Sequence, residues 1–137
     1  MTRSLKTSFA ILTLMSLIGV ADAQENGLLV RIAEVEIDSR YLEEYMSILK
    51  EEAEASVSLE PGVISIFPMF QPENPTEIRI LEIYASREAY EAHLKTPHFQ
   101  KYKTTTLEMV KSLKLVDMQA ADARTMAEIF KKARVSQ

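Results

Sequence analysis

The chain of 137 residues has no cysteine, no tryptophan and only three glycines. Without cysteine it cannot form disulfides, so its stability must come from a hydrophobic core or from an oligomer. Three glycines are too few for a glycine-rich dinucleotide-binding fold, which is therefore excluded. The 16 Lys and Arg are outnumbered by 20 Asp and Glu and form no basic cluster. Nucleic-acid binding is not expected, because it depends on neutralising phosphates.

The first residues predict a targeting segment. Arg3 and Lys6 make a basic start, residues 9–20 are an apolar run, and Ala21-Asp22-Ala23 fits a signal-peptidase cleavage pattern. The run is shorter than the about 20 apolar residues that a bilayer span needs. We therefore expect a signal peptide at residues 1–23 and a periplasmic or secreted protein that does not contact the membrane after cleavage. The remainder is one domain in size.

Strand and helix patterns alternate along that remainder. Strands are predicted at residues 28–37, 63–71, 78–84 and 115–119, and helices at 38–59, 86–96 and 98–112. Pro68 cannot donate a ladder hydrogen bond, which places the second strand at a sheet edge or at a bulge. This order predicts a ferredoxin-like α+β domain over residues 24–119, an antiparallel sheet with helices on one face. Residues 120–137 keep helical spacing and predict a C-terminal helix docked on the sheet or on a partner.

Residues 78–102 contain both histidines of the chain. Glu82 and Tyr84 share one face of the third strand, and His93 lies on the apolar stripe of the helix that Ser86 caps. We expect these three side chains to face one chamber. His98 follows at the start of the next helix, where it is either a substrate contact or a surface residue.

His93 and Glu82 are the candidate catalytic pair. Histidine can accept and return a proton near neutral pH. A carboxylate on a central strand is costly unless it is paired, so Glu82 could orient His93, or could bond a backbone amide, Arg79 or Arg87. His93 could equally be a hydrogen-bonded core residue. No metal is expected, because zinc needs three or four ligands and a proline separates the two histidines.

The run Glu82-x-Tyr84, followed by Ser-x-x-Ala-x-x-x-His-Leu-x-Thr-Pro-His-Phe, resembles the antibiotic biosynthesis monooxygenase family. The element order extends the resemblance from Leu28 to Gln119. It implies a dimeric α/β barrel and cofactor-free oxidation of a small aromatic or quinol by dioxygen. His93 would be the base, steered by Glu82, and Tyr84 or His98 would hold the oxyanion. The implied substrate-binding residues are Phe67, Phe70, Tyr90, His98, Phe99 and Tyr102, although the two strand phenylalanines could simply be core.

Other functions remain open at this stage. Haem degradation by related proteins draws on a tryptophan, which this chain lacks. An isomerase of a small phosphorylated ligand would need cations at the pocket mouth, for which Arg31, Arg79 and Arg87 are available. A non-catalytic dimer that binds a small apolar ligand is the third reading. A homodimer is expected because the sheet has a second apolar face to hide, with Leu81 and Ile83 in the contact.

Overall fold

The structure is a computed structural model that describes residues 27–135, so the predicted signal peptide lies outside the described residues. Four antiparallel strands form one sheet in the order β2-β3-β1-β4. This arrangement confirms the ferredoxin-like α+β fold. The elements are β1 (Leu29–Ile37), a 3₁₀ turn η1 (Ser39–Tyr41), α1 (Leu42–Leu59), β2 (Val63–Gln71), β3 (Asn74–Tyr84), α2 (Arg87–His93), α3 (Pro97–Thr105), β4 (Val110–Met118) and α4 (Ala123–Val135).

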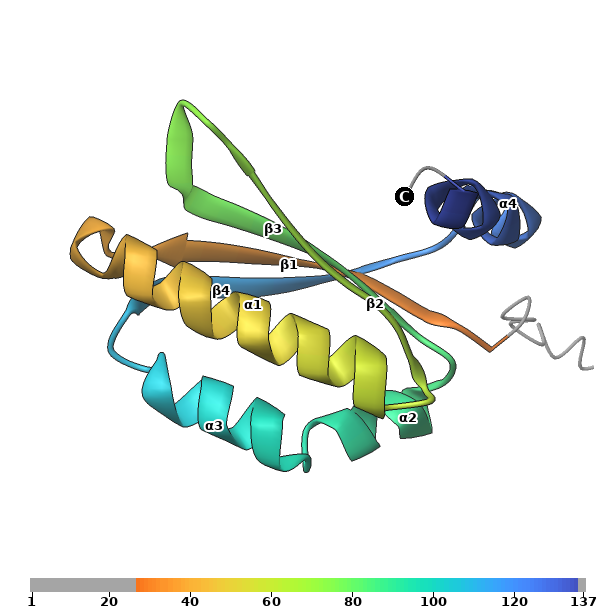
Figure 1. The fold of residues 1–137 in the computed structure, drawn as a ribbon, viewed down its shortest axis with the longest axis horizontal. Helices are drawn as coiled ribbons and strands as arrows, with labels where there is room; N and C mark the ends of the chain where they lie inside the picture. Colours follow the sequence, from red (N-terminus) through yellow and green to blue (C-terminus); the bar gives the residue numbers. More distant parts are fainter. Residues whose placement is uncertain (1–26, 136–137) are drawn as a thin grey trace, which may run out of the picture.

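One face of the sheet carries the helix layer and the core. α1 and α3 lie side by side beneath the sheet, with α2 at one end of α3 (Figure 1). Alternate residues of β1 are buried toward them, because successive side chains on a strand point to opposite faces. The inward side chains of α1 recur at helical spacing, with Tyr45 and Leu49 fully buried. The sandwich between sheet and helices therefore holds the hydrophobic core.

The start of each central helix follows its sequence signal. The Ser86 hydroxyl accepts a bond from the backbone N–H of Ala89, and Thr96 accepts one from Phe99, with Pro97 in the first helical position. Asp38 caps the 3₁₀ turn that precedes α1. β2 is an edge strand, as Pro68 required.

The predicted helix over residues 98–112 is wrong at its C-terminal end. α3 ends at Thr105, and Val110 already belongs to β4, which pairs with β1 along its length. Thr104 and Thr105 are the last residues of α3 and Thr106 caps it, and β-branched side chains have a slightly lowered helix propensity. Leu113 and Leu115 fit a strand as well as they fit a helix stripe, and pairing with β1 decides between the two.

No helix of residues 27–135 forms a layer over the centre of the opposite face of the sheet (Figure 1). Leu81 and Ile83 lie on it, as predicted from the alternation of β3, although Ile83 is only 5% exposed within this single chain. Phe67 and Met69 are exposed on the same face, because each pairs with an outward residue of β3. This face therefore presents contiguous apolar side chains.

The C-terminal helix α4 stands apart from the layer formed by α1 and α3 (Figure 1). Ile129 and Phe130 are exposed on it, and its last turn is basic. No helix among residues 27–135 combines the length and apolar content that a membrane crossing requires.

Gly62 sets the approach of α2 to the sheet. A Cβ built at this position would lie 2.5 Å from the Cβ of Ala89, closer than real Cβ atoms approach. The Gly62 carbonyl also accepts a 2.8 Å bond from the backbone N–H of Ala85, just before α2. The absent side chain therefore lets α2, with His93 at its end, pack against the start of β2.

Gly62→Ala should destabilise the protein by about 1–3 kcal/mol, the usual cost of overpacking. Adding Ala89→Gly should recover part of that loss, although glycine inside a helix itself costs about 1 kcal/mol. Urea unfolding of the two single variants and the double variant measures the coupling. A Gly62→Ala midpoint equal to that of the wild type would contradict the close contact.

Candidate functional site

A cavity of about 560 Å³ lies between the helix layer and the sheet. Its walls are mainly apolar and aromatic, a composition typical of small-molecule sites. Six of the predicted site residues line it, namely Glu82, Tyr84, Tyr90, His93, Phe99 and Tyr102. The cavity therefore brings together most of the residues that the sequence singled out.

The predictions for Phe67 and Phe70 as pocket walls are wrong, since neither lines the cavity. Phe67 pairs with Leu81, so its side chain points to the helix-free face, where it is 58% exposed. Phe70 is on the helix-facing side but near the tip of the β2–β3 hairpin, beyond the core. A bulge at Pro68 would have redirected these side chains, but the register shifts of β2 occur elsewhere.

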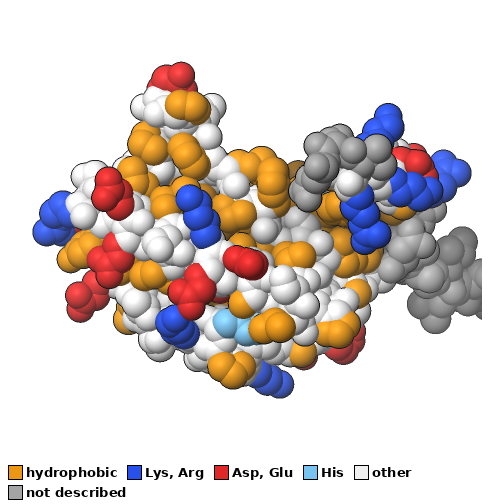
Figure 2. Space-filling model, viewed as in Figure 1, with side chains coloured by type: hydrophobic (Ala, Val, Ile, Leu, Met, Phe, Trp, Pro, Cys, Tyr) orange, Lys and Arg blue, Asp and Glu red, His pale blue; other side chains and the backbone are white. Residues whose placement is uncertain are grey.

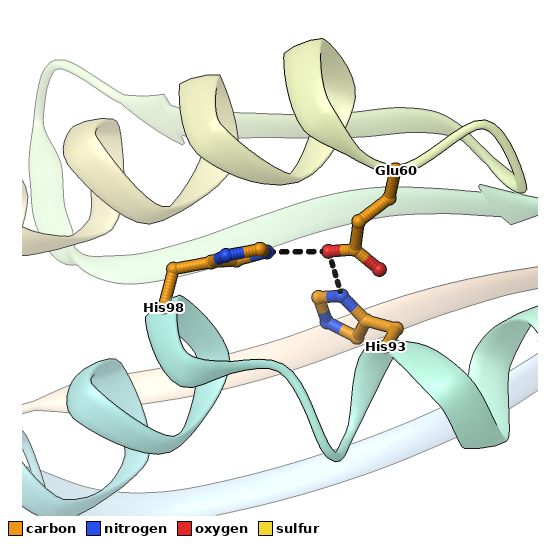
Figure 3. Close-up of side chains that lie close together, drawn as sticks. All are labelled: Glu60, His93 and His98. Atoms are coloured by element: carbon orange, nitrogen blue, oxygen red, sulfur yellow. Dashed lines mark hydrogen bonds and ion pairs between the residues drawn. The ribbon is translucent and has the colours of Figure 1, made fainter.

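The two imidazoles converge on one carboxylate. The Nδ1 atom of His93 is 2.9 Å, and the Nε2 atom of His98 2.5 Å, from the same Oε1 atom of Glu60 (Figure 3). His93 ends α2, His98 is in the first turn of α3, and Glu60 caps the C-terminus of α1. The expectation that Pro97 keeps the histidines apart is therefore wrong, because the break turns both rings toward α1.

Glu60, and not Glu82, is the partner of His93. His93 is 2% exposed, and the carboxylate of Glu60 fixes the orientation of its ring. Burial alone would raise the pKa of Glu60, but the bonds from both histidines and their positive potential lower it. Glu60 is consequently the charged acceptor of the cluster. Imidazole surface reaches the outside of the molecule among hydrophobic side chains (Figure 2).

Glu82 has its own partners on the sheet. Its Oε2 atom accepts a 3.1 Å bond from the hydroxyl of Tyr84, and Arg31 is its neighbour across the β1–β3 pair. Burial raises the pKa of Glu82, opposed by the Tyr84 bond and by the charge of Arg31. Arg31 is itself buried, bonded to Asp117 at 2.7 Å, and lies over the ring of Tyr90. Glu82 thus belongs to a sheet-borne polar network beside the cavity.

Sequence reasoning missed Glu52, a second buried carboxyl that lines the cavity. It accepts a 2.6 Å bond from the Ser56 hydroxyl and lies 3.7 Å from the Nε2 atom of His93. Burial raises the pKa of Glu52. Glu52 follows Leu49 by three residues, so helical spacing could have predicted that its side chain lies on the inner face of α1. Glu60 directly follows the predicted helix over residues 38–59, where no helical periodicity marks it.

The hydroxyl of Tyr84 is committed to Glu82, so it is not a free donor for a substrate. His98 likewise has its Nε2 atom bonded to Glu60. Tyr102 differs, because its hydroxyl meets that of Tyr45 at 2.7 Å and also lines the cavity. Burial raises the pKa of Tyr102 to about 12, opposed by the hydrogen bond with Tyr45. Either hydroxyl can donate in this pair, and when Tyr45 donates, the proton of Tyr102 is available to a ligand.

None of the three arginines proposed for a phosphorylated ligand lines the cavity. Arg31 is paired with Asp117, and Arg79 lies near Glu34 and Glu77. Arg87 is exposed in the first turn of α2. The arginine cluster that this reading required is therefore not formed at the cavity.

Comparison of the sequence with models of known protein families identifies the family of the chain. The model of the antibiotic biosynthesis monooxygenases matches residues 28–105, which is more than half of the sequence. The chain belongs to the antibiotic biosynthesis monooxygenase family. The matched range contains the Glu60–His93–His98 cluster and most of the cavity wall, and it confirms the resemblance seen in residues 82–99.

Solved structures agree with this assignment. A protein from Bacteroides thetaiotaomicron, proposed to be an antibiotic biosynthesis monooxygenase, is 46% identical with a TM-score of 0.70, over 72% of this chain and 93% of that one. A proposed monooxygenase from Lactobacillus acidophilus is 31% identical (TM-score 0.66), over 70% of this chain and 45% of its own. A family protein from Nitrosomonas europaea, 20% identical over 72% and 95% (TM-score 0.67), shares the fold. No protein of curated function matches significantly.

Glu82→Gln should stabilise the protein increasingly as pH rises. A carboxyl whose folded-state pKa is raised favours folding fully below its ordinary pKa of 4.5, and this contribution is lost as pH rises through the folded value. Glutamine cannot ionise and keeps the shape, so the variant should unfold at higher urea than wild type at pH 7 and approach it near pH 4. Glu73→Gln, in the exposed β2–β3 turn, is the control. Parallel wild-type and Glu82→Gln curves across pH would contradict the assignment.

Proposed function

We propose that the chain is a cofactor-independent monooxygenase that oxidises a small phenol or quinol with dioxygen in the cavity beneath the sheet. The observation that carries this proposal is a buried imidazole, His93, with one nitrogen bound to Glu60 and the other directed to the cavity side, near Glu52. Membership of the monooxygenase family supports an oxygenase over a binding protein.

Glu60 prepares His93 to act as a base. An ionised carboxylate can only accept hydrogen bonds. The bond between Glu60 and Nδ1 of His93 therefore selects the imidazole tautomer that carries its proton on Nδ1. The lone pair of Nε2 is then free on the other side of the ring. In this role Nε2 removes the phenolic proton of the substrate, and Glu60 stabilises the imidazolium that forms.

Tyr102 is the donor best placed to hold the phenolate. Its hydroxyl can accept from that of Tyr45 and then donate its own proton to the substrate, whereas the hydroxyl of Tyr84 is bonded to Glu82. The rings of Tyr90 and Phe99 offer stacking surfaces for a flat substrate, with Phe99 centred 4.7 Å from the ring of His93. The apolar walls exclude water, which strengthens each of these polar contacts.

The reaction balances without a redox cofactor. A quinol and one dioxygen yield one hydroxyquinone and one water, so a single oxygen atom enters the product. The substrate supplies all four electrons, and the protons released from it end on water. The protein has to generate the electron-rich anion, hold it beside dioxygen and return the proton.

Oxygen uptake with a panel of reduced naphthoquinols tests the proposal. Wild-type protein should accelerate uptake above autoxidation and form hydroxylated quinone. His93→Ala should lower kcat by about 10²–10⁴, the range for a lost general base. Tyr102→Phe should lower kcat by up to about 10²–10³, as when one oxyanion donor is removed.

Two controls separate this reaction from chemical background. Autoxidation of a quinol releases hydrogen peroxide, so catalase returns oxygen to the solution in that case and not in the enzymatic one. Glu51→Gln changes an exposed carboxyl of α1 and should leave the rate unchanged. Wild-type uptake at the autoxidation rate with every quinol, or full activity of His93→Ala, would overturn the proposal.

We propose in addition that the chain forms a homodimer through the helix-free face of the sheet. Phe67 and Met69 are exposed there beside Leu81, and an apolar face of this kind favours a partner surface. Sedimentation at micromolar concentration should give a dimer for wild type and a monomer for Phe67→Asp. Val57→Asp, on the outer side of α1, should stay dimeric. A monomeric wild type would contradict the proposal.

A further inference from the structure

We propose that Glu60, His93 and His98 form a binding site for a divalent first-row transition-metal ion. One ligand atom from each residue lies within 4.8 Å of the other two. The three residues come from the end of α1, the end of α2 and the start of α3, and their side chains point to one spot (Figure 3). The proposal does not depend on the oxygenase reaction.

The donor set fits such an ion. Two imidazoles and one carboxylate are the ligands of catalytic zinc sites and of the facial triad that binds ferrous iron. Calcium and magnesium prefer oxygen ligands, so they do not match a set with two nitrogens. A three-residue set also leaves coordination positions open for water or another small ligand. The carboxylate of Glu60 supplies the negative charge of the set.

Modest side-chain movement would bring the ligands to coordination distance. Zinc lies about 2.0–2.2 Å from nitrogen and oxygen ligands, which separates tetrahedral ligand atoms by about 3.3 Å. The two contacts to Glu60 Oε1, at 2.9 and 2.5 Å, must therefore open slightly. The imidazole centroids, 6.5 Å apart, must approach by about 1 Å. His98 and Glu60 can provide this movement, since their side chains are 20% and 12% exposed at helix ends, whereas His93 is fixed.

The residues around His93 favour binding of the ion at the Nδ1 edge of its imidazole ring. Glu52, Phe99 and Tyr84 contact or face His93 from the cavity side. Glu60 and His98 do not line the cavity, so an ion between them would bind the Nδ1 edge of His93 at its rim. An ion on Nδ1 leaves the imidazole proton on Nε2. The ion-bound form and the base-competent form of His93 therefore exclude each other.

Direct metal titration tests the site. The full chain, prepared without a histidine tag and stripped with a chelator, would be titrated with Zn²⁺ by calorimetry and with Co²⁺ by visible absorption. We expect one Zn²⁺ per chain with a micromolar or tighter dissociation constant, a raised thermal-unfolding midpoint, and Co²⁺ bands that indicate nitrogen and oxygen ligation.

Substitutions of His98 and Glu60, the two proposed ligands nearer the surface, test the site most directly. His98→Gln and Glu60→Gln should each weaken Zn²⁺ binding by at least about tenfold and abolish the Co²⁺ bands. Their unfolding without metal shows whether each variant is folded. Glu51→Gln, an exposed carboxyl on the same helix as Glu60, should bind as wild type does. Absence of binding at micromolar Zn²⁺, or equal binding by wild type and folded His98→Gln, would overturn the proposal.

Discussion

The hydrogen bonds from two imidazoles to one oxygen of Glu60 connect the three helices that cover the sheet. Glu60 ends α1, His93 ends α2 and His98 begins α3. Charge-assisted hydrogen bonds of this kind are stronger than neutral ones, and a buried histidine without a partner would be costly. The position of His93 at the cavity therefore depends on the residue that caps α1, the helix that also contributes Glu52 and Ser56 to the site.

Two further carboxyls are buried without a full salt bridge, and this has an energetic cost. Glu52 is bonded to Ser56, and Glu82 to Tyr84, each through a neutral hydroxyl. A neutral donor compensates a buried charge incompletely, so burial raises the pKa of both groups. Buried ionisable groups with perturbed pKa values around a cavity are typical of functional sites. The cost in stability is consistent with a site maintained for chemistry.

Much of the fold could be predicted from the sequence because its signals are local. The alternation of β1, the proline in β2 and the caps at Ser86 and Thr96 each depend on residues next to one another. The end of α3 could not be predicted, because residues 110–118 fit two periodicities and the choice depends on pairing with distant β1. Phe67 was misplaced for a related reason, since one register decides which face a strand residue takes.

The sequence predicted many of the residues that line the candidate site, but not the hydrogen bonds between them. Residues 82–102 identified His93, Tyr90, Phe99 and Tyr102 on the cavity wall. The partner of His93 lies 33 positions earlier in the sequence, at a helix end, where no periodicity marks it. Glu82 on β3, which is much nearer to His93 in the sequence, was the natural local choice, yet its neighbours are Tyr84 and Arg31. Long-range polar pairs of this kind require coordinates.

The two edges of the His93 ring face different environments. Nδ1 faces Glu60 and His98 near the surface, whereas Nε2 faces Glu52 in the cavity wall. Because a neutral imidazole carries one proton, whatever binds Nδ1 determines whether Nε2 is an acceptor or a donor. In the proposed reaction Glu60 alone leaves Nε2 as an acceptor for the phenolic proton, whereas the proposed ion on Nδ1 would leave Nε2 as a donor. Occupancy at the surface edge of one ring would thereby set the chemistry available inside the cavity.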